Sequence, residues 1–499
     1  MPNDPTRPLD RNDPKIRFGS LSARRSPEEG LSAARFDRPA LRAVGWGLLI
    51  FAVVVFAWRG IWPGLNDSPD LAVGYAGGRA WLAGHDPYDA ATLNADILLA
   101  GGAEVVADRV LDRLPNVYFP TTIPAFAPLA LTPWPVAKLL WLGLNSAAAL
   151  FIATGSARLL GWPLRALRSR TLVAFILVLA PFHTTVALGQ TGLVSTAAVV
   201  AALLLERSGR RIPAGIAFGL ATILKIQIGL PFLAYLIWRR RWLSVVTAAL
   251  LVIGSSLLAV VRMHIAGVPW GSSWLTNLTV ASSPGGLNDS SPANPERYSL
   301  INLQYPLSIL VPGPVWANLA AIVLVGLAAA ILLWIARRYR PGEELLVVSI
   351  VAVLGLLVTY HRYYDAVVLA LPIAWAFSMV GTTRWRQAAL VILLCTDFIF
   401  PVLGAMRLAD ERQMLPLGLT DSLIWRVVLL PIHVWVLVSL VAVLLWSLAR
   451  APRHQVGADT SLSSGRPSSS AWLGAAVVLE ATHASTELMI RPILECSCI

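Results

Sequence analysis

The sequence comprises 499 residues, of which 56% are hydrophobic and only 14% are charged. Soluble domains carry about 25% charged residues, so a chain this apolar cannot keep its surface in water and needs lipid around it. The net charge of +12 is spread over the ends of apolar runs and forms no basic patch with interleaved aromatic residues. The composition therefore excludes a soluble globular protein and argues against nucleic-acid binding.

The distribution of polar and apolar residues divides the chain into three segments. Residues 1–43 are polar and rich in proline and arginine, and we expect a disordered cytoplasmic arm there. Residues 44–448 form the predicted membrane domain, and residues 449–499, rich in serine and glycine, form a predicted disordered cytoplasmic tail. The apolar runs lie at about 44–60, 136–157, 171–187, 191–205, 242–262, 315–336, 343–360, 363–380, 387–404 and 422–447. Most have the roughly 17–25 residues that cross a bilayer, which predicts an all-α polytopic bundle of about 10–13 membrane helices, re-entrant pieces included.

The segment 212–238 is apolar but is interrupted by Lys225 and Pro231. Arginines flank the segment on both sides, and basic residues favour the cytoplasmic face. A single crossing would place one flank on the wrong side of the membrane. We therefore expect a broken or re-entrant pair of short helices with Lys225 near the turn, and another short helix at 300–312.

Basic residues also determine the predicted orientation in the cell membrane. Placing every arginine cluster in the cytoplasm gives a self-consistent alternation of spans with both termini cytoplasmic. The loop 61–135 then lies outside the cell. It contains eight acidic residues and only three arginines, so it lacks the excess of basic residues that marks a cytoplasmic loop. The clusters placed inside comprise Arg24, Arg25, Arg35, Arg38, Arg42, Arg158, Arg165, Arg168, Arg170, Arg337, Arg338, Arg340, Arg384, Arg386, Arg450 and Arg453.

In this topology, polar residues from distant parts of the chain converge at the outer face. Ionisable groups at membrane depth are costly, so each one is a candidate for function. The converging residues are Asp67, Asp70, Tyr118, Gln190, Lys225, His361, Arg362, Tyr364 and Asp365.

Each of these residues also has a simpler interpretation. Asp70 is equally compatible with a solvated loop carboxylate, Tyr118 with an interfacial elbow beside its prolines, and Gln190 with a tight turn between two glycines. Lys225 is compatible with a cation that extends to the membrane surface, and the run 361–365 with local pairing inside a loop.

Other features limit the chemistry that the chain can perform. It contains no phosphate-binding loop, dinucleotide fingerprint, zinc-protease motif or nucleophile elbow. We therefore predict no metal and no cofactor, and substrates that come from the lipid phase or the outer compartment. Asp397 and His433 lie inside apolar runs and are expected to be internal hydrogen-bonding partners.

An ordered set of short motifs resembles glycosyltransferase family 87 over about residues 41–448. The set begins with Asp70-Leu-Ala-Val-Gly-Tyr75 and the following Gly84-His-Asp-Pro-Tyr88, and continues with Tyr118-Phe-Pro120. It ends with Gly189-Gln190, Leu224-Lys225 and His361-Arg-Tyr-Tyr364-Asp365. The chain departs from the family pattern at Thr121 and Thr191, where the family often has a second proline and an asparagine.

The resemblance implies a membrane glycosyltransferase of the GT-C class. Such enzymes typically transfer mannose, with inversion, from a polyprenyl-phosphate-sugar donor to a glycolipid or glycan acceptor outside the cytoplasm. By resemblance, Asp70 is the expected general base. Lys225, His361 and Arg362 are expected to stabilise the leaving phosphate. The other expected substrate-binding residues are Tyr75, Tyr88, Tyr118, Gln190, Tyr364 and Asp365.

Two other function classes fit part of the sequence. Broken helices and intramembrane charge also occur in transporters, although the two halves of this chain show no clear repeat. A non-enzymatic envelope-assembly protein is the other alternative.

Overall fold

The structure is a computed structural model that describes residues 39–337, 342–400, 402–412, 414 and 418–451. The predicted disordered tail and residues 1–38 of the predicted arm lie outside the described residues, apart from the start of the tail at 449–451. Helix α2 (Pro39–Phe56) begins before residue 44, where we expected the first membrane segment to start. Proline is favourable at a first helical position because the N–H that it lacks would have no partner there.

Five helices of the described chain are long and apolar enough to cross a membrane. They are the combined helix Ala40–Asn66, α9 (Trp134–Leu159), α15 (Trp242–Ile265), α18 (Pro314–Ala336) and α23 (Ile432–Ala449). The first of these consists of α2, the π-helical turn η1 (Ala57–Ile61) and α3 (Trp62–Asn66). A sixth candidate is α10 (Leu167–Leu177) with α11 (Ala180–Leu188), two helices bent by 52°. The predicted all-α polytopic bundle is confirmed.

The other apolar runs form helices that are shorter than a full crossing. Hydropathy does not distinguish lipid from protein surroundings, and α19 (Glu344–Val358) is buried by its neighbours over most of its length. For this reason the expected 10–13 membrane helices exceed the five or six that qualify by length and composition. The remaining shorter helices are α12 (Gly192–Arg207), α13 (Arg211–Leu224), α14 (Ile226–Trp238), α20 (Ala370–Met379) and α21 (Trp385–Thr396).

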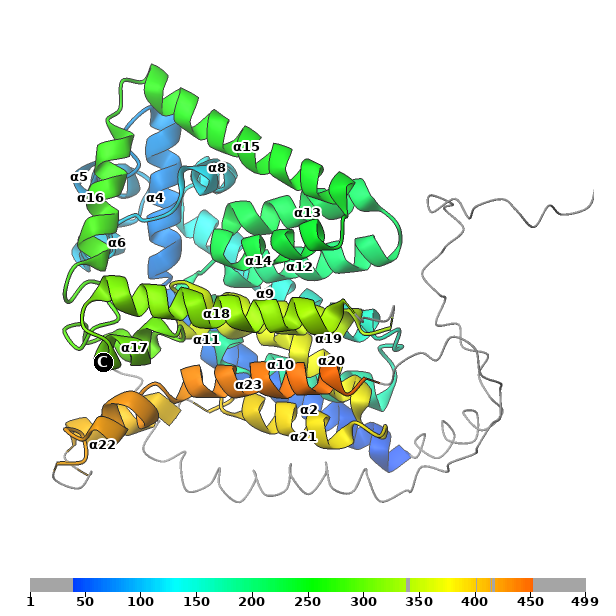
Figure 1. The fold of residues 1–499 in the computed structure, drawn as a ribbon. Coiled ribbons are helices and arrows are strands. Elements are labelled where there is room, and N and C mark those ends of the chain that lie inside the picture. Colours follow the sequence, from blue (N-terminus) through cyan, green and yellow to red (C-terminus); the bar gives the residue numbers. More distant parts are fainter. Residues whose placement is uncertain (1–38, 338–341, 401, 413, 415–417, 452–499) are drawn as a thin grey trace, which may run out of the picture.

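Short helices gather at one end of the bundle (Figure 1). Those labelled in Figure 1 are α4 (Pro69–Ala83), α5 (Ala90–Leu99), α6 (Ala103–Ala107), α8 (Ile123–Ala130), α16 (Trp270–Ser282), α17 (Gln304–Leu310) and α22 (Val402–Glu411). The connecting segments also contain the short elements α7 (Val110–Arg113), η2 (Pro120–Thr122), η3 (Arg297–Ser299) and η5 (Trp425–Leu429). Helix α17 confirms the short helix expected within 300–312.

Helix α4 is held at this end by an aromatic core of its own. Phe126 of α8 and Trp134 of α9 are buried in one cluster with Tyr75 of α4, whose ring lies 5.3 Å from that of Trp134. The approach of α4 to α8 requires glycine, because a Cβ at Gly74 would collide with the Phe126 ring and one at Gly78 would lie 3.0 Å from its Cβ. Position and orientation of α4 are therefore set by close packing.

The apolar segment 212–238 is broken as predicted. Lys225 separates α13 from α14 with extended backbone angles (φ −154°, ψ 93°). The two helices then approach closely, since a Cβ on Gly229 would lie 2.5 Å from the Cα of Thr222. Lys225 thus lies in a tight break inside the bundle.

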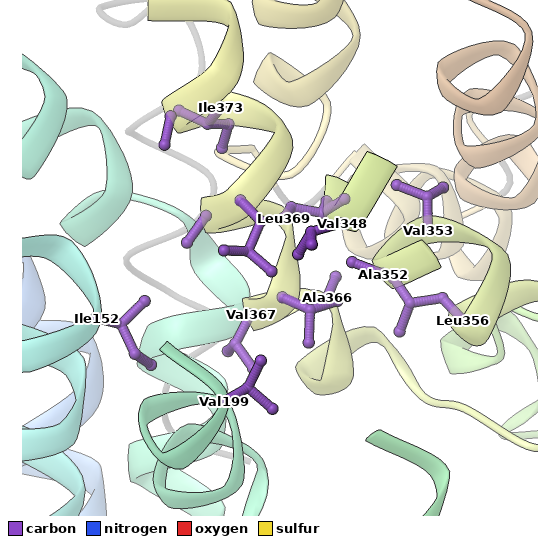
Figure 2. Packing of buried hydrophobic residues seen from close by; sticks show 14 of the residues in the cluster. Ile152, Val199, Val348, Ala352, Val353, Leu356, Ala366, Val367, Leu369 and Ile373 are labelled. Carbon is purple, nitrogen blue, oxygen red and sulfur yellow. The ribbon is translucent and has the colours of Figure 1, made fainter. Parts of the chain in front are cut away.

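A 3₁₀ segment, η4 (Tyr363–Leu369), passes through the centre of the main core. Figure 2 shows Ala366 and Val367 of η4 among Val199 of α12 and Ala352 of α19. This packing anchors the C-terminal half of η4 and holds the polar residues immediately before it.

The ends of the long helices follow a consistent pattern in Figure 1. The first residues of α2 and the last residues of α18 and α23 lie at the end of the bundle opposite to α4 and α16. Arg337 and Arg450 directly follow α18 and α23. The predicted clustering of basic residues at one end therefore agrees with the arrangement of these helices.

Candidate active site

Asp70 lies in the first turn of α4, directly after a sharp change of direction in the chain. Ser68 before it adopts a left-handed conformation (φ 88°), and its hydroxyl donates to the Gly64 carbonyl at 2.9 Å. Gly189 is also left-handed (φ 70°), and a Cβ there would lie 2.7 Å from that of Leu71. This contact brings the turn that carries Gln190 against the start of α4.

Lys225 is the centre of a buried polar cluster. Its Nζ lies 2.5 Å from Oδ1 of Asp365 and donates to Oε1 of Gln190 at 3.1 Å. The ammonium also lies 4.6 Å from the centroid of the Tyr364 ring, a cation–π arrangement. Gln190 in turn donates to the Tyr364 hydroxyl at 3.1 Å. Four residues from three distant segments are therefore locked together.

Asp365 connects this cation to the other polar residues of η4. Its Oδ2 lies 3.0 Å from Nδ1 of His361, whose Nε2 has no hydrogen-bond partner in the described chain. The α12 N-terminus is also near, because a Cβ at Gly192 would be 3.5 Å from Asp365 Oδ1. A helix N-terminus favours a carboxylate, so Asp365 has three favourable neighbours although its side chain is only 1% exposed.

Arg362 links the cluster to the loop between α16 and α17. Its Nε donates to the Tyr360 hydroxyl at 2.5 Å and its Nη2 to the Leu287 carbonyl at 2.8 Å. Leu300 of the same loop also pairs with Arg362 through an isolated antiparallel bridge. These contacts hold Arg362 near Asp70. Among the described residues, no carboxylate forms a salt bridge with its guanidinium.

The charge of Asp70 is governed by these neighbours. Removal from water raises the pKa of the Asp70 carboxyl above its ordinary value. Hydrogen bonding by Gln190 and the positive charges of Lys225 and Arg362 act in the opposite direction. A carboxylate with a raised pKa is a better proton acceptor than an ordinary one, provided that it is ionised.

Most of the residues predicted for the site meet in this cluster. Tyr118 lies near enough to Asp70 and Asp365 to interact with their charges. Asp67, by contrast, is exposed at the end of α3.

Two predicted substrate-binding residues lie elsewhere. Tyr75 is fully buried and donates to the Thr132 carbonyl at 2.7 Å, and the Tyr88 hydroxyl donates to the Tyr118 carbonyl at 3.1 Å. The structure gives these two tyrosines packing partners in the outer helices, and their contact with substrate stays a prediction.

Three residues of the site were not selected from the sequence. Tyr360 holds the Arg362 guanidinium, and its position directly before the predicted run 361–365 could have indicated it. Thr185 donates to the Tyr364 carbonyl at 2.9 Å, and Trp141 donates to the Gly189 carbonyl at 2.7 Å. No local sequence signal identifies these last two contacts, because they join segments that meet only in the fold.

The arrangement combines a proton acceptor with a concentration of cations. Asp70 is partly exposed at the edge of the cluster, whereas Lys225 is only 10% exposed. Such a site can accept a proton from a hydroxyl and stabilise a phosphate that leaves with negative charge. Among the described residues, no three His, Cys, Asp or Glu side chains lie together as metal ligands.

Two comparisons with known proteins bear on this chemistry. The profile of glycosyltransferase family 87 matches residues 116–359, which include Tyr118, Gln190 and Lys225 but not Asp70 or His361. The chain is also 26% identical, over 446 residues, to the polyprenol-phosphate-mannose-dependent alpha-(1-2)-phosphatidylinositol mannoside mannosyltransferase of Mycobacterium tuberculosis. This alignment covers 85% of the chain and 94% of the relative. No solved structure matches. The resemblance predicted from the sequence is confirmed.

Proposed function

We propose that this membrane glycosyltransferase transfers a mannosyl residue from polyprenyl-phosphate-mannose to a hydroxyl of a glycolipid. The name of the relative gives a phosphatidylinositol mannoside as its acceptor, and a lipid acceptor suits a protein with several helices long and apolar enough to cross a membrane. Both matches are to glycosyltransferases, and they therefore favour this enzyme over a transporter or an assembly protein.

One observation supports the proposal above all others. Asp70, Gln190, Lys225 and the run 361–365 come from four distant segments, yet they converge in an otherwise apolar bundle. Burying several ionisable groups together is costly, and membrane proteins retain such groups where function requires them.

The proposed reaction is a single displacement. The acceptor hydroxyl oxygen attacks C1 of the mannosyl group while Asp70 takes the hydroxyl proton. The bond between C1 and the phosphate oxygen breaks on the opposite face, and its electron pair leaves with the polyprenyl phosphate. Attack from the opposite face inverts C1, and base catalysis of this kind contributes about 10²–10⁴-fold.

Lys225 and Arg362 are the cations proposed for the leaving phosphate. In the absence of substrate, Asp365 neutralises Lys225 at 2.5 Å, as a buried charge requires. Arg362 is anchored by the Tyr360 hydroxyl and the Leu287 carbonyl, both uncharged. A phosphate could therefore bind Arg362 without displacing an ion pair, and could share Lys225 with Asp365. His361 is proposed to bind the same substrate through its unpartnered Nε2.

The proposed location of the site is the extracytoplasmic face of the cell membrane, with both termini cytoplasmic. The support is the distribution of charge: basic residues follow α18 and α23 at the end of the bundle away from α4. The loop 61–135, which carries α4, is acidic. Donor and acceptor lipids would both reach such a site from the outer leaflet.

The test compares two carboxylates that lie three positions apart. Asp70→Asn keeps the size and polarity of the side chain but removes the base, so transfer from polyprenyl-phosphate-mannose by the purified protein should fall about 10²–10⁴-fold. Asp67→Asn changes an exposed carboxylate at the end of α3 and should retain full activity. Equal rates for Asp70→Asn and Asp67→Asn would refute the assignment of the base.

A further inference from the structure

The combined helix Ala40–Asn66 contains a π-helical turn, η1, with an arginine at its centre. Trp58 and Trp62 on either side of Arg59 are 55% and 65% exposed on the outer surface of the bundle. Tryptophan favours the headgroup level of a membrane, and π-helical turns inside helices frequently occur at functional sites. Arg59 is therefore positioned near the level at which lipid phosphates lie.

Among the described residues, no acidic side chain or carbonyl group balances the charge of Arg59. The side chain is half-buried, and its guanidinium forms no hydrogen bond and no ion pair within the described chain. The second π-helical turn, η5, offers a direct contrast, because its Arg426 lies 3.1 Å from Asp421. An unpaired guanidinium within a membrane helix is costly and is expected to meet an anion from outside the protein.

The surroundings of Arg59 contain a second unpartnered polar group. His183 of α11 lies near enough to interact with the charge of Arg59, and it packs against the same turn. A Cβ on Gly60 would lie 3.3 Å from the His183 carbonyl oxygen. His183 is only 2% exposed; its Nε2 hydrogen-bonds to the Leu177 carbonyl at 2.7 Å, and its Nδ1 has no partner among the residues that the structure describes. The guanidinium of Arg59 and the Nδ1 atom of His183, both without a partner in the described chain, therefore lie where η1 packs against α11.

The region of Arg59 adjoins the active site but is distinct from it. Tyr363 interacts with the charge of Arg59 and directly precedes Tyr364, which contacts Lys225. The Tyr363 ring stacks on Phe398 at 5.6 Å and lies 4.8 Å from the ring of His433. Asp397, the nearby acid, is paired with His433 and does not pair with Arg59.

We infer that Arg59 binds the phosphodiester of the acceptor lipid. The inference rests on the proposed function, in which Lys225 and Arg362 receive the phosphate of the donor. An acceptor with its own phosphodiester brings a second anion to the protein, and that anion needs a second cation at headgroup level. Arginine suits this role because its planar guanidinium can bind two phosphate oxygens at once.

The first experiment measures lipid binding without catalysis. Purified protein in detergent is titrated with phosphatidylinositol or with diacylglycerol of the same acyl chains, and bound lipid is counted by native mass spectrometry. The wild-type protein should retain phosphatidylinositol about tenfold more tightly than diacylglycerol, and Arg59→Gln should abolish the difference. Arg59→Lys, which keeps the charge, should retain part of it.

Arg426→Gln is the matched control. It removes an arginine from the other π-helical turn, where Asp421 already neutralises it, and should leave the preference for phosphatidylinositol unchanged. Equal retention of both lipids by the wild-type protein would overturn the inference even if Arg59→Gln did not fold. The same conclusion would follow if Arg426→Gln lost the preference as fully as Arg59→Gln.

The second experiment asks whether the bound phosphate is that of the acceptor. Transfer is measured with a mannosylated phosphatidylinositol and with an uncharged alkyl mannoside as acceptors. Arg59→Gln should raise KM about tenfold or more for the charged acceptor only, with unchanged KM for the donor. A changed donor KM, or equal losses with both acceptors, would overturn the assignment. So would unchanged kinetics with intact lipid binding, because Arg59 would then hold a bystander lipid.

The two experiments separate this inference from the proposed function. If the wild-type protein transferred no mannose to either acceptor, the proposed function would fail. The binding measurement would still show whether Arg59 selects a lipid with a phosphodiester.

Discussion

Helix α15 and the pair α13–α14 lie side by side and are similarly apolar, but only α15 is continuous. Leu250 and Leu257 of α15 are 66% and 57% exposed on the bundle surface, as expected for a lipid-facing span. The pair α13–α14 is instead interrupted at Lys225, whose ammonium enters the polar cluster. The difference shows how a short break brings a cation into the interior of a membrane protein.

The break leaves few backbone groups without partners. The Lys225 N–H donates to the Ala221 carbonyl at 3.0 Å, and the Lys225 carbonyl accepts from the N–H groups of Ile228 and Gly229, each at 3.0 Å. Backbone groups inside a membrane must be satisfied within the protein, so an interruption of this kind persists only where such bonds form. The broken pair is therefore a defined structure that carries a specific side chain.

The largest effect expected in this comparison comes from Lys225→Met. Removing the cation should lower kcat for mannosyl transfer about 10²–10³-fold, the loss typical when a group that stabilises transition-state charge is removed. The measurement is initial rate with the purified variant at saturating donor.

Two controls make the Lys225 result specific. Lys138→Met removes an ammonium that lies 3.8 Å from Glu104, outside the cluster, and should leave kcat unchanged. Adding Asp365→Asn to Lys225→Met removes the carboxylate left without its cation, and should restore stability but not activity. A double variant with wild-type kcat would show that Lys225 has no role in the reaction.

The next largest effect is expected from a substitution of Gly229 in α14, compared with the same substitution of Gly254 in α15. Gly229→Ala would place a Cβ 2.5 Å from the Cα of Thr222 and force α13 and α14 apart, which costs about 1–3 kcal/mol. We expect a lower melting temperature in detergent together with reduced transfer, because Lys225 moves with the break. Gly254→Ala in α15 meets nothing within 4 Å and should leave both measurements unchanged. Equal stability of the two variants would contradict the tight break.

A smaller effect concerns the pH dependence of transfer. Asp70 must be ionised to act as a base, so kcat/KM should fall as the pH drops through its pKa, which burial raises above the ordinary value of a carboxyl. Gln190 opposes this rise, so Gln190→Met should raise the pKa of Asp70 further. The acidic limb of the pH–rate profile should therefore move to higher pH. A limb that moves to lower pH would show that Asp70 does not control it.

The smallest effect is expected on the lipid-facing surface of α15. Leu250→Ala shortens a side chain that is 66% exposed on the bundle surface and creates no cavity. Transfer rate and melting temperature should remain close to those of the wild-type protein. A loss of activity as large as that of Gly229→Ala would mean that this surface of α15 contacts a substrate or another protein.

The sequence was sufficient to predict the break and most of the residues that meet in the polar cluster, for identifiable reasons. Arginines on both flanks of 212–238 conflict with a single crossing, and this conflict indicated the turn at Lys225. Asp397 and His433 hydrogen-bond to each other, as their positions inside apolar runs suggested. These predictions used signals that each segment carries by itself.

Other features depend on contacts between segments and could not be derived in this way. Helix α19 is short and is buried by neighbouring helices, which distinguishes it from a lipid-exposed span. Its hydropathy does not make this distinction, because a buried helix and a lipid-exposed helix are equally apolar. Tyr75 was grouped with Asp70 because both lie in one motif. In the helix, however, Tyr75 packs on Trp134 with the rings 5.3 Å apart, while Asp70 faces the cluster. The π-helical turn at Arg59 has no marker in the sequence.

The glycines of α4 have a consequence for inhibitor design. Because Gly74 and Gly78 allow α4 to pack closely on Phe126, Asp70 is attached to a tightly packed support. A receptor of this kind favours molecules already shaped to it, since neither partner then loses conformational freedom on association. Constrained sugar analogues carrying a short anionic lipid should accordingly bind better than flexible ones of equal size.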